Sequence, residues 1–517
     1  MKHHITTPIY YVNDSPHIGH AYTSIIADIF SRNIRVQEGE SNVFFLTGTD
    51  EHGQKIEQSA QKKSINPQSF CDEISIKFKN LTPDFNLSNN YFIRTTDTAH
   101  KQGVQKFWLK LEENGWIYKD KYCGWYAVRD EAFYSEEELV NGKAPTGADV
   151  EWQEEESYFF KLSAMQDILL EVYHDKFVFP SYRLNEVKSF VTMGLKDLSI
   201  SRTSFKWGIE VPSNKNHVIY VWLDALTNYI TALGYPDSTM YKDFWLSNSK
   251  KIHFIGKDIL RFHAIFWPAF IIAEKLTLDE VKILSSLSKT DLQNNHTFQE
   301  IQNFFKNFEI VSHGWWKNNG EKMSKSLNNA INPYDLKDEF GLDKVRYFFL
   351  RNMPFGNDGD FIKNNFIEVT NADLANNIGN LTQRVMSFIY NNCDQKIPSP
   401  SSDFKLDNFC STQNLEKNFN KAILNYNFED AINEVLKAGK NANQIINSMA
   451  PWNLKKEGKI EEMNNLLFAI SLDIFTIYKT LECIMPSSAK KGLDIFNGKS
   501  PEPNQKINKP EPIFMRI

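Results

Sequence analysis

Short apolar segments that end in polar loops alternate with helical segments along much of this chain, and this alternation limits the folds that it can adopt. Runs rich in β-branched and aromatic residues predict strands, and apolar residues recurring every three or four positions predict the helices between them. Alternation at this spacing is typical of parallel βαβ units, so we expect an α/β fold with a split, doubly wound parallel sheet. Ligands of such sheets bind beyond the carboxyl ends of the strands, although no GxGxxG sequence predicts a dinucleotide there. The predicted strands are 9–12, 43–46, 91–93, 217–221, 252–255 and 308–312.

The composition narrows the class of protein. A chain of 517 residues is too long for one hydrophobic core, so we expect several domains. Its net charge of −6 argues against a general nucleic-acid coat while leaving room for a local basic groove. No apolar run is long enough to cross a bilayer, and the first strand begins so soon after Met1 that we expect no signal peptide. The five cysteines form no CxxC pair and no disulfide framework, which is typical of a reducing compartment. Together with the lack of a membrane-spanning run, this predicts a soluble, cytoplasmic protein with no membrane partner.

Three segments depart from the alternation. Residues 118–207 are acidic and less regular, which indicates an inserted domain. The polar stretch 279–307 has no clear period before Phe298, and we interpret it as a surface insertion with one short helix. From residue 361 onward the period is helical almost throughout, which predicts a helical bundle. The composition from Asn497 predicts a loosely attached tail.

The segment after the first strand carries a candidate anion site. Ser15 and Pro16 suit the N-cap and first turn of the helix that follows. His17 and His20 then lie three residues apart on the first turn, beside backbone N–H groups and the positive end of the helix dipole. Gly19 leaves room for a ligand such as a triphosphate. Taken alone, two histidines at a helix start are more often surface or capping residues.

A second cationic segment, Gly320–Ser326, follows the last predicted strand. Lys322 and Lys325, together with the hydroxyl of Ser324, lie on a loop entered through glycine. Such a loop can close over a phosphate and stabilise charge that builds up only during transfer. A solvated basic loop is the commoner explanation of a lysine pair considered alone.

Together the two segments resemble a known pair of signatures. His17-Ile18-Gly19-His20 and Lys322-Met323-Ser324-Lys325-Ser326 look like the HIGH and KMSKS motifs of class I aminoacyl-tRNA synthetases. Further stretches resemble the methionyl-tRNA synthetase family, and the resemblance covers nearly the whole chain. These stretches are 7–13, 47–53, 220–225, 254–258, 262–263 and 312–316.

The resemblance implies a methionine–tRNA ligase. Its reaction activates methionine with ATP to methionyl-adenylate and pyrophosphate, and then passes methionine to the 3′-terminal ribose of tRNA(Met), including the initiator tRNA. It also implies a Rossmann-like catalytic domain split by a connective domain. The implied segments are 1–117 and 208–330 for the catalytic halves, the second with the KMSKS loop, 118–207 for the connective domain, 331–360 for a stem-contact region and 361–517 for a helical anticodon-binding domain.

The family's functional residues carry over position by position. His17, His20, Lys322 and Lys325 would be catalytic. ATP would be bound by His17, Gly19, His20, Asp258, Lys322, Ser324 and Lys325. The methionine pocket would be formed by Ile9, Tyr11, Asp50, Trp222, Ala225, Tyr229, Ile259 and His263, with Asp50 pairing with the substrate ammonium. The CAU anticodon would be read by Asn380, Arg384 and Trp452. Asp224 is left between a ligand role and a capping role. Without the resemblance, core packing explains each aromatic, and a solvated helix face explains Asn380 and Arg384.

The resemblance also implies cofactors and partners. Mg²⁺ should accompany ATP, held mostly by phosphate oxygens and water. Cys123 has no partner cysteine at knuckle spacing, so we expect no structural zinc and no other protein-bound metal. The chain ends at Ile517 without the extension that dimerises some relatives, which predicts a monomer. Two alternatives stay open: a catalytically silent tRNA-binding paralogue, and a nucleotidylyltransferase, which shares the histidine motif and the sheet.

Overall fold

The computed structural model describes every residue of the chain except 131, 324–328, 354 and 407–408, and every side chain among them except those of 122, 123, 132, 133 and 155. The chain forms two compact units. The first unit consists of Met1–Pro16 with Ile34–His313, and the second of His17–Asn33 with Gly314–Ile517. Within the described part of the chain, no helix has both the length and the apolar character that a membrane span requires.

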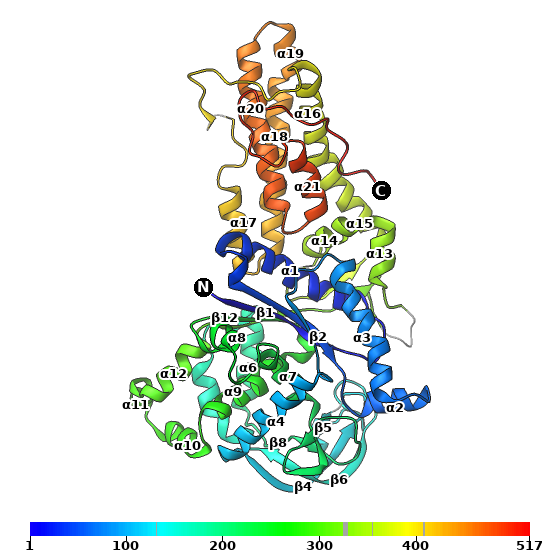
Figure 1. The fold of residues 1–517 in the computed structure, drawn as a ribbon, viewed down its shortest axis with the longest axis vertical. Coiled ribbons are helices and arrows are strands. Elements are labelled where there is room, and N and C mark those ends of the chain that lie inside the picture. Colours follow the sequence, from blue (N-terminus) through cyan, green and yellow to red (C-terminus); the bar gives the residue numbers. More distant parts are fainter. Residues whose placement is uncertain (131, 324–328, 354, 407–408) are drawn as a thin grey trace. The chain divides into compact units, whose positions relative to one another are not determined.

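The central sheet of the first unit has six strands, all parallel, in the order β3-β2-β1-β12-β13-β7 (Figure 1). Its inner strands are almost continuously buried, as expected for a parallel sheet with both faces covered. The strand order reverses between β1 and β12, which is the point where doubly wound sheets bind ligands. The predicted fold class is therefore confirmed. The strands are β1 His3–Tyr11, β2 Val43–Asp50, β3 Tyr91–Arg94, β7 Val178–Phe179, β12 Lys250–Gly256 and β13 Phe308–His313.

One predicted strand of this sheet was wrong. Residues 217–221 overlap β11 Asn214–Ile219, which pairs antiparallel with β9 Ser201–Arg202 and β10 Glu210–Val211 in a separate sheet. Its place in the central sheet is filled by the two-residue strand β7, which pairs with β13. A short apolar run predicts a strand, but it does not indicate which strand will pair with it. A strand of two residues, such as β7, is too short to be recognised from the sequence pattern.

Many of the elements of the first unit pack on one large hydrophobic core. Residues such as Leu46, Val104, Leu226, Phe270 and Ile310 bring β2, α4, α7, α9 and β13 into that core. The helices are α2 Gln54–Lys62, α3 Pro67–Asp84, α4 Thr98–Glu113, α5 Gln166–Val172, α6 Ser181–Thr192, α7 Val221–Thr231, α8 Thr239–Tyr241 and α9 Trp267–Lys275. A further antiparallel sheet has the order β5-β4-β6-β8, with β4 Ile117–Ala127, β5 Ala132–Tyr134, β6 Glu151–Phe160 and β8 Leu198–Ser199.

The stretch predicted to be a surface insertion with one short helix forms three helices instead. They are α10 Leu278–Ser286, α11 Lys289–Asn294 and α12 His296–Phe305. Each has a side-chain N-cap, from Thr277, Ser288 and Asn295 respectively. Phe298 and Phe305 are completely buried, which anchors the stretch to the core.

The second unit contains helix α1 Ile18–Glu38 as far as Asn33 and a bundle in which α16, α18 and α20 lie side by side (Figure 1). Helix α1 begins at Ile18 and not at the predicted Ser15–Pro16 cap. A small sheet has the order β15-β14-β16. The elements are β14 Trp316–Asn318, β15 Glu321–Lys322, β16 Gly359–Phe361, α13 Pro333–Phe340, α14 Leu342–Arg351, α15 Lys363–Thr370, a π-helical stretch Asn371–Gly379, α16 Asn380–Asn392, α17 Leu415–Leu424, α18 Phe428–Met449, α19 Pro451–Lys456, α20 Ile460–Leu481 and α21 Pro486–Asp494.

The predicted loose tail is attached to the bundle. The backbone of Ile397 donates to the Gln505 carbonyl (2.8 Å) and accepts from Asn504 (2.8 Å). The ring of Phe514 is buried and stacks on Tyr478 with centroids 6.4 Å apart. Backbone hydrogen bonds and one buried aromatic ring thus attach this polar segment, and composition alone does not reveal them.

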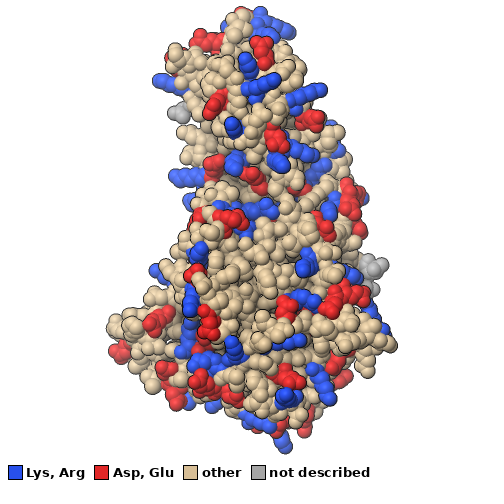
Figure 2. Space-filling model, viewed as in Figure 1, with Lys and Arg blue, Asp and Glu red and all other residues tan. Residues whose placement is uncertain are grey.

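Surface charge is mixed. Figure 2 shows Lys and Arg side chains interspersed with Asp and Glu on the visible face, which agrees with the small net charge of −6.

Candidate active site

The first turn of α1 holds both predicted histidines in a folded-back arrangement. The backbone N–H of Gly19 donates to Nδ1 of His17, and the backbone N–H of His17 donates to Nδ1 of His20, each over 3.1 Å. The two imidazole rings face each other with centroids 3.8 Å apart. A Cβ atom on Gly19 would lie 2.9 Å from Cε1 of His17, so the absence of a side chain gives the His17 ring its place.

These hydrogen bonds determine which ring nitrogen carries the proton. An Nδ1 atom that accepts a backbone N–H cannot itself be protonated, so each ring carries its hydrogen on Nε2. Burial and the neighbouring His17 ring both lower the pKa of His20 well below its ordinary value. His20 is therefore a neutral hydrogen-bond donor at physiological pH.

The same unit packs segments on either side of the second motif against the helix that carries the first. The backbone N–H of Ile18 donates to the carbonyl of Ile331, which lies between the lysine-rich loop and α13 (3.0 Å). The ring of Tyr22, one turn further along α1, contacts the edge of Trp316 on β14 at 5.6 Å. Since β14 pairs with β15, which ends at Lys322, the histidine helix and the entry to the loop belong to one packed structure.

Lys322 rests on an aromatic ring. Its Nζ atom lies 4.2 Å from the ring centroid of Trp315, a cation–π contact. Asn329 joins the two ends of the loop, because its side chain donates to the Lys322 carbonyl (3.3 Å) and its carbonyl accepts from Asn318 (2.9 Å). Ser324 and Lys325, the other predicted residues of this loop, lie outside the described residues.

Several residues of the predicted methionine pocket follow the carboxyl ends of the central strands. Tyr11 ends β1 and pairs in register with Asp50, which ends β2. Ile9 and Tyr11 are partly buried, and Asp50 is only 8% exposed. A carboxylate on this edge of the sheet, beside the switch point between β1 and β12, is well placed for a cationic ligand group.

A hydrogen-bonded pair lies at the centre of the remaining pocket residues. The Tyr229 hydroxyl and Nε2 of His263 are 2.7 Å apart, and Nδ1 of His263 is 3.0 Å from the carbonyl of Ile259. Because the carbonyl can only accept, Nδ1 carries the proton and the Tyr229 hydroxyl donates to Nε2. Burial lowers the pKa of His263 to about 4, so its ring is neutral.

The pocket wall beside this pair is aromatic. Trp222 stacks on Phe262 with ring centroids 3.6 Å apart, and its edge approaches the ring of His263 at 6.4 Å. Ala225, on the same helix α7, is 6% exposed. Asp258 follows β12 and is exposed, and Gly256 leaves room for its carboxylate, since a Cβ there would lie 2.5 Å from Oδ1. The first unit thus brings Trp222, Tyr229, Ile259 and His263 together as predicted.

Comparisons with known proteins agree with the family resemblance seen in the sequence. The family model described as tRNA synthetases class I (M) matches residues 3–150 and 145–386. A methionine–tRNA ligase of Rickettsia bellii (strain RML369-C) is 48% identical over 502 residues, which are 95% of this chain and 92% of that protein. One of Mesorhizobium japonicum is 42% identical over 505 residues, 96% of this chain and 91% of that protein.

A solved structure agrees in fold. Mycobacterium tuberculosis methionyl-tRNA synthetase in complex with methionyl-adenylate matches with a TM-score of 0.89 at 36% identity, covering 99% of this chain and 100% of that one. The chain belongs to the methionyl-tRNA synthetase family. The predicted family, fold and enzyme class, an aminoacyl-tRNA synthetase of the methionine–tRNA ligase type, are confirmed.

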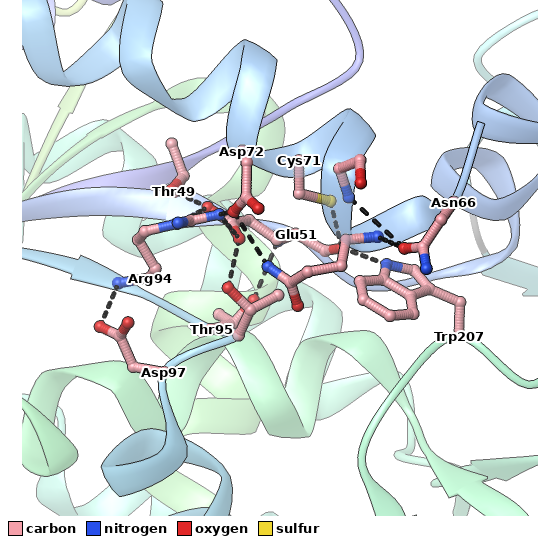
Figure 3. A network of polar contacts seen from close by, with 12 residues as sticks. Thr49, Glu51, Asn66, Cys71, Asp72, Arg94, Thr95, Asp97 and Trp207 are labelled. Carbon is pink, nitrogen blue, oxygen red and sulfur yellow. Dashed lines mark hydrogen bonds and ion pairs between the residues drawn. The ribbon is translucent and has the colours of Figure 1, made fainter. Parts of the chain in front are cut away.

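A polar network around the buried Glu51, next to Asp50 of the predicted methionine pocket, was not predicted from the sequence (Figure 3). Glu51, next to Asp50, is completely buried and accepts two hydrogen bonds from Arg94, at 2.7 and 2.8 Å. Its backbone carbonyl accepts from Nε1 of Trp207 at 2.6 Å, and Arg94 also donates to Asp72 at 2.6 Å. The network fixes the backbone on which Asp50 is mounted. Only the run of polar residues at the end of an apolar strand could have indicated it.

Two of the three predicted anticodon residues meet on the bundle. The Arg384 guanidinium lies 5.2 Å from the ring centroid of Trp452 and donates to Asn447 at 3.0 Å. Trp452 is partly exposed, which argues against a core plug, and Asn380 is exposed at the start of α16. The arrangement offers a flat aromatic surface and hydrogen-bond donors at one place in the second unit.

Cys123 is the residue on which the prediction of no structural zinc depends. Among the residues that the structure describes, no three His, Cys, Asp or Glu side chains gather as a metal-binding group. The side chain of Cys123 lies outside that description, so the absence of zinc stays a prediction.

Proposed function

We propose that the two histidines and two lysines of the signature motifs catalyse methionine activation by positioning and by charge stabilisation. A methionine carboxylate oxygen forms a bond to the α-phosphorus of ATP while the bond from that phosphorus to the bridging oxygen breaks, and pyrophosphate leaves with the electron pair. The carboxylate is already charged, so this step needs no general base. His17 and His20 donate their Nε2 hydrogens to phosphate oxygens, and Lys322 and Lys325 neutralise the departing pyrophosphate.

The observation that carries this proposal is the pair of hydrogen bonds from backbone N–H groups to the Nδ1 atoms of both histidines. These bonds keep each ring in the tautomer that can donate from Nε2. They also hold the donors in place before the nucleotide binds, so little reorganisation is needed during the reaction. We also propose Gly19 in the second unit and Asp258 in the first unit as ATP-binding residues.

The predicted pocket residues of the first unit recognise methionine. Asp50 pairs with the substrate ammonium, a charge-assisted bond. The thioether lies against Trp222 and the neutral Tyr229–His263 pair, with Ile9, Tyr11, Ala225 and Ile259 completing the wall. Neutral partners suit a polarizable sulfur better than an ion would, because an ion loses more solvation on burial.

In the second reaction step methionine is transferred to tRNA. The 2′-hydroxyl of the terminal ribose of tRNA(Met) attacks the adenylate carbonyl, the ester forms and AMP leaves. Residues 331–360 contact the tRNA stem, and 361–517 bind the anticodon. Mg²⁺ bound with ATP would be held mostly by phosphate oxygens and water and would offset phosphate charge. The protein acts as a cytoplasmic monomer without structural zinc.

Methionine-dependent exchange of labelled pyrophosphate into ATP tests the proposed reaction. The wild-type protein should incorporate label with methionine, ATP and Mg²⁺ present, and not when methionine is omitted. No incorporation with methionine, or faster incorporation with another amino acid, would overturn the assignment.

Trp452→Ala should weaken tRNA charging and leave pyrophosphate exchange unchanged. Loss of a stacked base costs about 1–3 kcal/mol, so kcat/KM for tRNA should fall about 5- to 150-fold. Trp452→Phe keeps an aromatic face and should retain most of the charging activity. A parallel fall in exchange would show that Trp452 is a structural residue of the bundle.

A further inference from the structure

Three side chains form a completely buried cluster behind the methionine pocket, and none of them was assigned a role above. Oδ2 of Asp224 lies 2.6 Å from Nδ1 of His52, and Oδ1 lies 2.7 Å from Nε2 of His100. The exposed fractions are 0% for Asp224, 2% for His52 and 1% for His100. With both oxygens occupied in the buried interior, Asp224 is not a ligand for ribose or ammonium.

The protonation of the cluster follows from its geometry. The ionised carboxylate accepts from both rings, so His52 donates from Nδ1 and His100 donates from Nε2. Nδ1 of His100 lies 2.7 Å from the hydroxyl of Thr231, which fixes the orientation of that ring. Burial raises the pKa of Asp224, but the two histidines outweigh it and lower the pKa to about 2, so the carboxylate is ionised throughout the working range.

The cluster joins the two walls that hold opposite ends of the substrate. His52 follows two residues after Asp50, which we assign to the ammonium. Asp224 lies on α7 between Trp222 and Ala225, which we assign to the side chain. His100 lies on α4, which packs so tightly on α7 that a Cβ at Gly103 would come within 2.4 Å of Thr231.

We infer that Asp224, His52 and His100 are positioning residues that set the distance between the ammonium site at Asp50 and the thioether pocket on α7. This inference rests on the proposed function. A buried charge is a poor device for stability alone, because well-packed apolar residues do as well or better. Two short, directional hydrogen bonds to one carboxylate do supply what a binding site needs, namely a fixed separation and orientation. A misplacement of about 1 Å in such a site can cost on the order of 100-fold in rate.

Two amide variants with matched apolar controls test the inference. In His52→Asn the carboxamide N–H can reach the position of Nδ1 and keep the bond to Asp224, whereas His52→Leu fills similar space without a donor. In His100→Gln the longer amide can reach the position of Nε2, and His100→Leu is its control. We would measure KM for methionine, KM for ATP and kcat by pyrophosphate exchange, together with the thermal midpoint of each variant.

The leucine variants should raise KM for methionine about 10- to 100-fold while KM for ATP changes less than about threefold. The amide variants should recover most of the methionine affinity. Equal KM values for methionine in the amide and leucine variants would overturn the inference. So would a rise in both KM values in step with a lower thermal midpoint, since that is the pattern of a purely structural core. An inactive wild type would instead refute the proposed function, and this inference with it.

Discussion

Arg346→Met should lower the free energy of unfolding of the second unit by about 3–5 kcal/mol, because it removes the fully buried one of the two arginines, Arg32 and Arg346, that pair with the buried Asp28 carboxylate. Arg346 is completely buried and donates to Oδ2 of Asp28 on α1 at 2.6 Å. It also donates to the carbonyls of Ile484 (2.7 Å) and Cys483 (3.2 Å), just beyond the C-terminal end of α20. A cation at that position satisfies orphan carbonyls and opposes the helix dipole. Urea denaturation followed by far-UV circular dichroism measures the change.

An exposed ion pair supplies the matched control. Lys363 and Glu339 pair in the same unit with side chains 56% and 48% exposed, so Lys363→Ala should cost less than about 1 kcal/mol. Asp28→Asn combined with Arg346→Met should recover part of the loss, because it removes a buried charge that then pairs with Arg32 alone. A loss for Arg346→Met no larger than that for Lys363→Ala would show that the ion pair adds nothing.

His20→Ala should reduce kcat for pyrophosphate exchange about 100- to 1,000-fold, the range seen when one preorganised donor to developing charge is removed. Methionine affinity, measured directly by calorimetry without ATP, should stay within about twofold, because the pocket residues lie elsewhere in the chain. His20→Gln keeps an N–H near the position of Nε2 and should lose less.

The pH dependence tests the same assignment. Since burial lowers the pKa of His20 well below its ordinary value, the ring stays neutral as the pH falls from 8 to 6, and exchange should not fall through protonation of His20. A fall in the wild-type rate of pyrophosphate exchange around pH 6.5 that is absent in His20→Gln would contradict this assignment. So would equal losses of exchange and of methionine binding in His20→Ala.

The sequence was most informative where burial and local pattern coincide. β2, β12 and β13 were predicted because a run of buried apolar residues is visible without knowing what covers it. Of β1 only residues 9–11 were predicted, because its buried start is mostly polar, with His3, His4, Thr6 and Thr7. The histidine and lysine motifs were visible because their chemistry depends on residues close together in sequence. The bundle was visible because its helices are long and amphipathic.

Features that depend on distant partners were not visible. The bonds from Arg94 and Trp207 to Glu51, and from His52 and His100 to Asp224, form only when separate elements pack together. The same holds for the pairing of β11. By contrast, α10 could have been predicted, because Thr277 and Glu280 form a capping box that is readable in the sequence.

The membership of α1 in the second unit has a consequence for biosynthesis. Residues His17–Asn33 emerge from the ribosome early, yet their unit is completed by Gly314–Ile517. Their partners Trp316 and Arg346 follow roughly 300 codons later, a wait of about 15–60 s at 5–20 residues per second. During that interval the apolar face of this helix is exposed on the nascent chain. We expect a ribosome-associated chaperone to bind the chain at this segment.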